Sequence, residues 1–135
     1  MAILLTGGAG YIGSHACVEF LDKGYDIIVV DNLVNSDKSV IDKIKTITGK
    51  DFKFYEVDIR DKEKLQGIFK ENKVEAVIHF AGFKAVGESV LEPLKYYDNN
   101  IGGTISLLEA MKGSNVNKIV FSSSATVYGT PKTVP

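Results

Sequence analysis

The chain opens with a short apolar run that breaks into glycines and then continues with the periodicity of an amphipathic helix. Residues 2–5 are four consecutive apolar residues, as a strand covered on both faces requires, and residues 11–21 carry apolar side chains at helical spacing. The glycines between them fit the pattern Gly7-x-x-Gly10-x-x-Gly13, and Gly8-x-Gly10-x-x-Gly13 fits as well. Glycines in this place allow a sharp turn, a close approach of phosphate to the backbone, and tight packing of helix on strand. The stretch therefore predicts a dinucleotide phosphate site, with a glycine-rich turn that binds nothing as the alternative.

A carboxylate stands where such a site needs one. Asp31 follows Gly13 by 18 residues, at the end of a second apolar run over residues 27–30. A carboxylate there accepts hydrogen bonds from the adenosine ribose and repels a 2′-phosphate. Because Asn32 and Leu33 bring no arginine to reverse that preference, the predicted cofactor is NAD rather than NADP.

Five strand-like runs alternate with four predicted helices along the whole chain. The runs cover residues 2–5, 27–30, 52–57, 76–80 and 119–121. This alternation predicts an α/β fold of the Rossmann type, a doubly wound parallel sheet with right-handed crossovers. Since residues 52–57 are the most polar run, we expect them at an edge, which gives the strand order 3-2-1-4-5.

Capping residues mark where the predicted helices begin and end. Asp61 is the expected N-cap of a helix that buries Leu65, Ile68 and Phe69. Ser36 or Asp37 is the expected cap of a helix that ends at Gly49.

The fourth helix is expected to begin near Pro93, where a missing N–H costs nothing. Gly102 and Gly103 lie inside it, which predicts a close approach to a neighbouring element. Its expected apolar face consists of Leu94, Tyr97, Ile101, Ile105, Leu108 and Met111.

Composition narrows the class of protein further. With 135 residues, 44% of them hydrophobic and 24% charged, the chain has the size and make-up of one globular domain. Sixteen basic against seventeen acidic residues, without blocks of like charge, give no electrostatic support for a nucleic-acid or membrane partner. No apolar run approaches the ~18 residues of a membrane span, and the N-terminus does not resemble a signal peptide, so we expect a cytoplasmic protein. Two separated histidines and the single cysteine, Cys17, predict no metal site and no internal disulfide.

Ligands of open parallel sheets bind at the carboxyl ends of the strands, where this chain places small or polar residues. Asp58 and Ile59 suit an adenine, although a strand-end turn explains Asp58 equally well. Lys84 can reach a phosphate or ribose, with a solvated surface charge as the alternative. His15 is interpreted as a packing or capping residue and His79 as a satisfied core histidine, and neither is interpreted as a catalytic base.

Several of these segments together resemble the UDP-glucose 4-epimerase family, a branch of the extended short-chain dehydrogenases/reductases. The match runs from end to end, and the segment from Lys84 to Ser89 and the serine-rich segment from Ser122 are its most specific parts. The resemblance rests on Thr6-Gly7-x-x-Gly10-x-x-Gly13, Asp31-Asn32-Leu33, residues 80–89, 96–100 and 121–129.

The resemblance implies a tightly held NAD, a UDP-sugar substrate and a homodimeric full-length protein. It implies that Ser124 touches both cofactor and sugar and that Lys84 reaches the substrate as well as the cofactor. In this family a tyrosine, whose pKa a nearby lysine lowers, deprotonates the sugar 4-hydroxyl while hydride passes from C4 to NAD, and hydride then returns to the other face of the 4-keto sugar. The implied cofactor contacts are Gly7, Gly10, Tyr11, Ile12, Gly13, Asp31, Asn32, Leu33, Val34, Asn35, Ser36, Asp58, Ile59, Phe80, Ala81, Gly82, Phe83, Lys84, Asn99 and Ser122.

The catalytic tyrosine and lysine of the family lie beyond Pro135. Tyr128 and Lys132 have the right spacing, but Gly129 and Pro131 between them make a helical turn improbable. We therefore interpret Tyr128 as structural and residues 1–135 as an NAD-binding domain that lacks its later strands and its sugar-nucleotide domain. Alone it is expected to be inactive, and its last strand, residues 119–121, is expected to be an apolar edge prone to self-association.

Other members of the wider family remain alternatives. Dehydratases carry an acidic pair after the serine-rich strand, where this chain has Ala125 and Thr126. Nothing comparable excludes a decarboxylase, although the segment from Lys84 to Ser89 favours an epimerase. A non-catalytic nucleotide-binding module is the alternative outside the enzymes.

Overall fold

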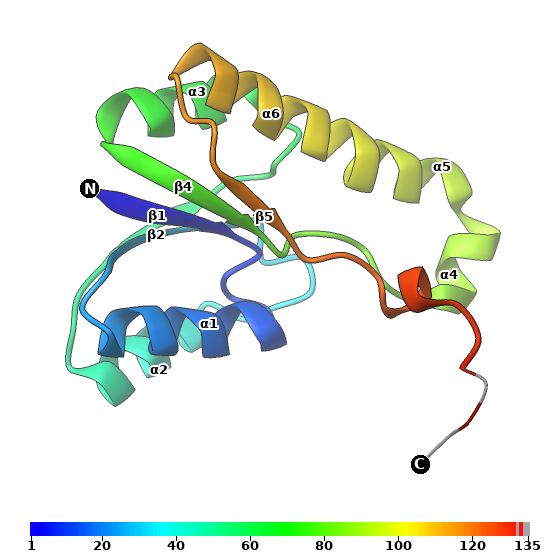
Figure 1. Cartoon of the computed structure of the whole chain (residues 1–135), viewed down its shortest axis with the longest axis horizontal. Helices are drawn as coiled ribbons and strands as arrows, with labels where there is room; N and C mark the ends of the chain where they lie inside the picture. The colour runs from blue at the N-terminus through cyan, green and yellow to red at the C-terminus, as the bar shows by residue number, and fades with distance from the viewer. Residues whose placement is uncertain (132, 134–135) are drawn as a thin grey trace.

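A computed structural model describes residues 1–131 and 133 and shows a five-stranded sheet between two layers of helices (Figure 1). The strands are β1 (Ala2–Thr6), β2 (Asp26–Asp31), β3 (Lys53–Glu56), β4 (Val74–His79) and β5 (Ile119–Phe121). Their order is β3-β2-β1-β4-β5 and every pair is parallel, which confirms the predicted topology.

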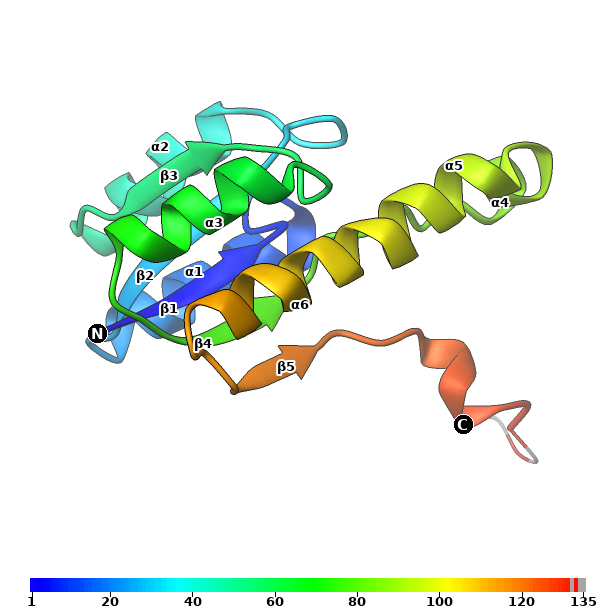
Figure 2. The ribbon, with the colours of Figure 1, turned by 90° about the horizontal axis from the view of Figure 1, so that it is seen from above.

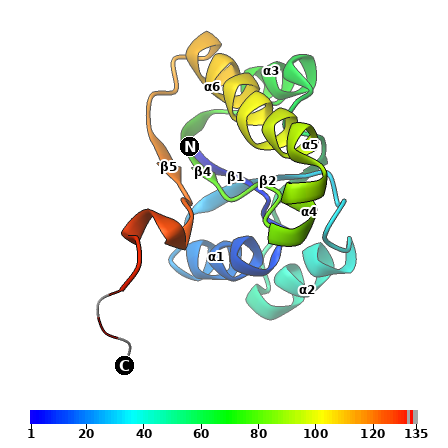
Figure 3. The ribbon, with the colours of Figure 1, turned by 90° about the vertical axis from the view of Figure 1, so that its right-hand side faces the viewer.

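Two pairs of helices cover the two faces of the sheet. Helices α1 (Tyr11–Asp22) and α2 (Ser39–Thr48) lie on one face, and α3 (Lys62–Glu71) and α6 (Gly103–Gly113) lie on the other (Figure 3). The short helices α4 (Val86–Leu91) and α5 (Pro93–Tyr97) precede a π-helical turn, η1 (Asp98–Gly102), and a 3₁₀ turn, η2 (Ala125–Tyr128), follows β5. Figure 2 shows α5, η1 and α6 as one continuous rod that extends past the carboxyl ends of the strands.

The alternation of side chains along each strand divides the core into two halves. Leu4, Ile28, Val30 and Val77 pack against α3 and α6, whereas Leu5, Ile27 and Val29 pack against α1 and α2. Burial on both faces is why the central strands are uninterrupted apolar runs. Cys17 belongs to the second half, as a small core residue, and its burial raises the pKa of the thiol to about 12.

The two edge strands differ in their chemistry. β3 has a charged residue at each end, Lys53 and Glu56, around the aromatic pair Phe54 and Tyr55, a polar content expected of an edge. β5 pairs only with β4 among the described residues, and its Val120 and Phe121 are 63% and 56% exposed. The predicted apolar edge is therefore confirmed.

The predicted face of the fourth helix is wrong. Leu94 and Tyr97 are 80% and 62% exposed, and of the predicted face only Met111 is buried. The π-helical turn adds a residue to the helical repeat and so rotates one part of the rod relative to the other. Burial falls instead on Tyr96, Asn99, Gly103, Leu107, Ala110 and Met111.

A glycine on the buried face allows the rod to approach the segment before α3 closely. A Cβ on Gly103 would lie 2.5 Å from Cδ1 of Ile59, so the close approach predicted for the glycine pair is confirmed at Gly103. At Gly102 an added Cβ would meet only Asp98 Oδ1, at 3.5 Å. The rod thus comes closest to the neighbouring segment at Gly103, where it has no side chain.

The other helix boundaries follow the predicted caps in part. Asp61 caps α3 by accepting from the Lys64 N–H, and Gly49 ends α2 in the left-handed conformation. Ser36 does not cap α2, because its hydroxyl donates to Asp31 Oδ1; Asp37 accepts the Ser39 N–H instead. Helix α4 was not predicted.

Among the described residues, no helix is both long enough and apolar enough to cross a membrane. The same residues contain no cluster of three or more His, Cys, Asp or Glu side chains that could hold a metal ion.

Candidate functional site

The glycine turn between β1 and α1 is shaped by close backbone contacts. Gly7 has φ +70° and its N–H donates to Val30 O, while the Gly10 N–H donates to Gly7 O. An added Cβ would lie 2.6 Å from Ala81 N at Gly7 and 2.2 Å from Gly7 O at Gly13. At Gly8 an added Cβ would meet Val29 Cγ1 at 2.7 Å. Close packing therefore requires glycine at Gly7 and at Gly8, the residues that distinguish the two glycine patterns of the sequence.

The first turn of α1 faces open space with free N–H groups. Gly10 is its N-cap and has no side chain that could bond them. Because the first N–H groups of a helix have no partner within the helix, they can donate to an anion, and the helix dipole adds to the attraction.

A cavity of about 510 Å³ lies in front of this turn, at the carboxyl ends of the strands. Most predicted cofactor residues line it: Gly7, Gly10, Tyr11, Ile12, Gly13, Asp31, Asn32, Val34, Asn35, Ser36, Ile59, Phe80, Ala81, Gly82, Phe83, Lys84 and Asn99. Sequence reasoning missed five lining residues, Val30, Val57, Ala85, Glu88 and Tyr96. Glu88 was missed because α4 was not recognised, and Tyr96, in α5, was missed because the wrong face of that helix was predicted to be buried. The Tyr96 hydroxyl donates to Glu88 Oε2 at 2.8 Å.

Four predicted site residues lie outside the cavity lining. Leu33 packs against the core beside α1 and α2. The carboxylate of Asp58 binds Arg60 and Asn32. Ser122 and Ser124 follow the edge strand β5, and Ser124 accepts the Thr126 N–H in a local turn.

Asp31 is 9% exposed and organises the loop after β2. Its Oδ1 accepts the Leu33 N–H at 2.9 Å and the Ser36 hydroxyl at 3.0 Å, and its Oδ2 accepts the Ala9 N–H at 3.0 Å. A carboxylate has about four acceptor positions, so one on Oδ2 remains for a ligand hydroxyl. The carboxylate thus joins the glycine turn to the β2–α2 loop at the cavity wall.

The loop after β4 is held by a side-chain amide. Asn100 Oδ1 accepts the Phe83 N–H at 2.8 Å, and Asn100 Nδ2 donates to Phe83 O at 3.0 Å. This pair copies the hydrogen bonding of a neighbouring strand, so Gly82, Phe83 and Lys84 keep a defined position although the sheet has ended.

His79 forms a buried hydrogen-bonded relay. The Thr104 hydroxyl donates to Asn100 O at 2.6 Å, so it must accept from His79 Nε2 at 3.1 Å. The Thr6 hydroxyl then donates to His79 Nδ1 at 2.6 Å. His79 is therefore neutral with its proton on Nε2, and it is the satisfied core histidine that was predicted.

We expect His79 to make stability depend on pH. Burial lowers the pKa of its imidazole from 6.5 to about 4, so the unfolded chain takes up a proton first as the pH falls. The contribution of neutral His79 to the free energy of unfolding is complete above pH 6.5. It decreases from there toward pH 4, by about 1.4 kcal/mol per pH unit. Between pH 7 and pH 5 the parent chain should lose about 2 kcal/mol more than His79→Gln in urea unfolding. An equal loss in both proteins would show that His79 does not cause it.

Tyr128 does not belong to a catalytic helix. It is the last residue of η2 and is 90% exposed, and Gly129 after it has φ +74°. The chain thus leaves the helical conformation directly after Tyr128, and Lys132 lies outside the described residues. His15, which is exposed, contacts Tyr11 O through Nδ1 at 2.8 Å within α1.

A glycine turn at a helix N-terminus, facing a carboxylate at the next strand end of a parallel sheet, defines a dinucleotide-binding domain of the Rossmann type. The model of the NAD dependent epimerase/dehydratase family matches residues 3–135, and the chain belongs to this family.

Named relatives make the similarity more specific. The chain is 64% identical to UDP-glucose 4-epimerase of Bacillus subtilis and 58% identical to that of Haemophilus influenzae, in each case over 135 residues, all of this chain and 40% of the relative. A crystal structure of UDP-glucose 4-epimerase from Bifidobacterium longum in complex with NAD⁺ and UDP matches with a TM-score of 0.95 and 54% identity. One from Stenotrophomonas maltophila with bound NAD and formylated UDP-arabinopyranose matches with a TM-score of 0.94 and 51% identity. Both matches cover all of this chain and 40% of the other, so the chain spans about 40% of the length of these relatives.

Proposed function

We propose that residues 1–135 form the NAD-binding part of a UDP-glucose 4-epimerase. The observation that carries this is that the uncapped α1 N-terminus and Asp31 line one cavity, with Asp31 Oδ2 accepting the Ala9 N–H of the glycine turn. The family match and the NAD-bound relatives support the same conclusion.

The residues present fit a dinucleotide. The pyrophosphate would lie on the N–H groups of Tyr11, Ile12 and Gly13, close to a backbone that has no Cβ at Gly10. The adenosine ribose would donate to the remaining acceptor position of Asp31 Oδ2. A 2′-phosphate would instead meet this carboxylate as a like charge, so the same residue selects against NADP.

NAD, when bound, supplies the acceptor and donor of the hydride at the sugar C4. We propose that Lys84, in the loop that Asn100 holds, reaches the cofactor and the substrate, and that Ser124 contacts the sugar. The tyrosine and lysine that the resemblance implies for proton transfer are not among the 135 residues, so we expect this chain alone to bind NAD without converting UDP-glucose to UDP-galactose.

Isothermal titration of the 135-residue chain with NAD and with NADP tests this proposal. NAD should bind, and NADP should bind at least about tenfold more weakly, which corresponds to 1.4 kcal/mol of repulsion at Asp31. Equal binding of the two would contradict the assignment of Asp31, and binding of neither would contradict the assignment of the cavity.

We further propose that the full-length protein is a homodimer. The candidate contact surface is the set of exposed apolar residues on α5, η1 and α6, since large apolar side chains that are exposed together mark protein interaction sites. They are Leu94, Tyr97, Ile101, Ile105 and Leu108. Sedimentation of the full-length protein measures its mass, and a monomer at micromolar concentration would contradict the proposal.

A further inference from the structure

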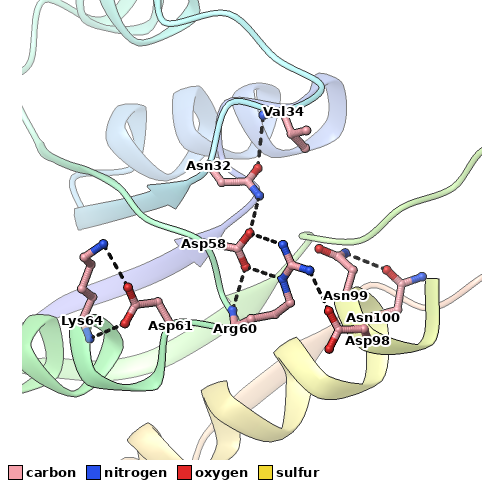
Figure 4. A network of polar contacts seen from close by, with 9 residues as sticks. All are labelled: Asn32, Val34, Asp58, Arg60, Asp61, Lys64, Asp98, Asn99 and Asn100. Atoms are coloured by element: carbon pink, nitrogen blue, oxygen red, sulfur yellow. Dashed lines mark hydrogen bonds and ion pairs between the residues drawn. The ribbon is translucent and has the colours of Figure 1, made fainter. Parts of the chain in front are cut away.

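Arg60 is the centre of a polar network beside the cavity (Figure 4). It lies between β3 and α3. Its backbone N–H and its Nε both donate to Asp58 Oδ1 at 2.9 Å, and its Nη2 donates to Asp58 Oδ2 at 2.8 Å. Its Nη1 donates to Asp98 Oδ2, in the π-helical turn, at 2.7 Å. One side chain therefore joins two segments that lie 38 residues apart in the sequence.

The network reaches a third segment through Asp58. Asn32 Nδ2, in the loop after β2, donates to Asp58 Oδ2 at 2.9 Å. Each oxygen of Asp58 thus accepts two hydrogen bonds, and its acceptor positions are all used by the protein. Asp58 differs in this from Asp31, which keeps one position free.

Each of the three segments contributes to the cavity wall. Asn32 lines the cavity itself, Ile59 stands between Asp58 and Arg60, and Asn99 follows Asp98. Asn99 is 4% exposed, and Ile59 packs so close to Gly103 that its Cδ1 would lie 2.5 Å from an added Cβ there. The guanidinium of Arg60, together with Asp58, therefore links the three segments that carry these wall residues.

The side chain of Arg60 is better suited to hold neighbouring segments in position than to stabilise the fold. Arg60 is 42% exposed, and ion pairs at such positions contribute little to folding. The planar guanidinium, however, offers donors in fixed directions, two toward Asp58 and one toward Asp98, which a lysine cannot do. Its contacts also hold the pKa of Asp58 well below the usual range, so both oxygens of Asp58 stay acceptors at neutral pH.

We propose that Arg60 is a positioning residue for the adenosine end of the bound dinucleotide. It sets the distance between the wall formed by Asn32 and Ile59 and the wall formed by Asn99. The inference rests on the proposed function, because it assumes that the adenosine half lies between these walls.

The test compares Arg60→Gln with a matched control in the same 135-residue chain. Lys62→Met removes the 2.7 Å ion pair to Glu109, which also joins α3 to the rod but contacts none of the wall residues. Arg60→Gln should bind both NAD and ADP-ribose about tenfold more weakly, because the wall must then be ordered on binding. Lys62→Met should bind both like the parent chain, and the two variants should have similar thermal midpoints.

Two further readouts separate positioning from a general loss of structure. The side-chain amide signals of Asn32 and Asn99 in ¹H–¹⁵N spectra of the ligand-free chain should move in Arg60→Gln and stay in place in Lys62→Met. Arg60→Lys, which keeps the charge, should not restore affinity. Restoration by lysine would show that charge alone matters and would overturn the proposal.

If Arg60→Gln does not fold, Asp98→Asn tests the positioning role of Arg60 instead. The Asp98→Asn variant keeps every contact between Arg60 and Asp58. It should weaken NAD binding at least about threefold, because one wall loses its charged partner. If Asp98→Asn folds and binds NAD as tightly as the parent chain, the positioning role of Arg60 is overturned, while the proposed function is unaffected. A parent chain that binds no NAD would overturn the proposed function and this inference with it.

Discussion

Gly13→Ala is expected to lower the free energy of unfolding by at least about 3 kcal/mol, because the new methyl group would collide with backbone. Its Cβ would lie 2.2 Å from Gly7 O and 2.8 Å from Gly8 Cα. Neither atom can move without shifting β1 or α1, which pack against each other at this point. Relief of the collision would also widen the turn that faces the cavity.

Gly67→Ala is the matched control for this substitution. Gly67 lies inside α3, and no atom is within 4 Å of the position of an added Cβ. Alanine there should stabilise the chain by up to about 1 kcal/mol through helix propensity. Urea unfolding of the two variants beside the parent chain measures both effects. A Gly13→Ala variant as stable as its parent would show that helix and strand are not in the close contact described.

Asp31→Asn is expected to weaken NAD binding more than tenfold and to lower stability by about 2 kcal/mol. Asp31 is 9% exposed and receives three donors, from Ala9, Leu33 and Ser36. An asparagine has one oxygen and one NH₂ group, so at least one of these donors would face another donor. The ribose would also lose its charged acceptor, and the repulsion of a 2′-phosphate would disappear, so NAD and NADP should bind more nearly alike.

Asp37→Asn provides the comparison on the same segment. Asp37 is exposed and accepts the Ser39 N–H at 2.8 Å, a bond that an asparagine oxygen can replace. The free energy of unfolding of the Asp37→Asn variant should differ from that of the parent chain by less than about 0.5 kcal/mol, and its affinity for NAD should be unchanged. Asp31→Asn and Asp37→Asn can be compared by the same titration and the same unfolding curve. Equal NAD affinity in the two variants would remove Asp31 from the proposed binding site.

Much of the site could be predicted because its signals are local. The strand, the glycine turn and the first helix are consecutive in the sequence, and Asp31 ends the very next strand. Strand order followed from composition, since the central strands are apolar on both faces and β3 is not. The contacts of Lys84 and Ser124 with a ligand stay predictions, and the structure places Lys84 at the cavity and Ser124 in a turn outside its lining.

Other features could not be predicted from periodicity. The apolar stripe from Leu94 to Leu108 satisfied the pattern of a buried face, yet the rod buries Gly103 and Ala110. Helix packing depends on how close two backbones come, and a small residue permits an approach that leucine prevents. The π-helical turn, which rotates the faces, has no periodic signal in the sequence.

The sequence by itself determined the order of the strands, the phosphate turn and the identity of the carboxylate that faces it, because neighbouring residues specify these through backbone freedom and burial. The tertiary structure decided which groups complete the walls. Thr6 meets His79 across 73 residues and Arg60 meets Asp98 across 38, and such pairs form only after the strands have been assembled. The reason is physical: hydrogen bonds between distant residues depend on the register and packing of whole elements, which no local pattern contains.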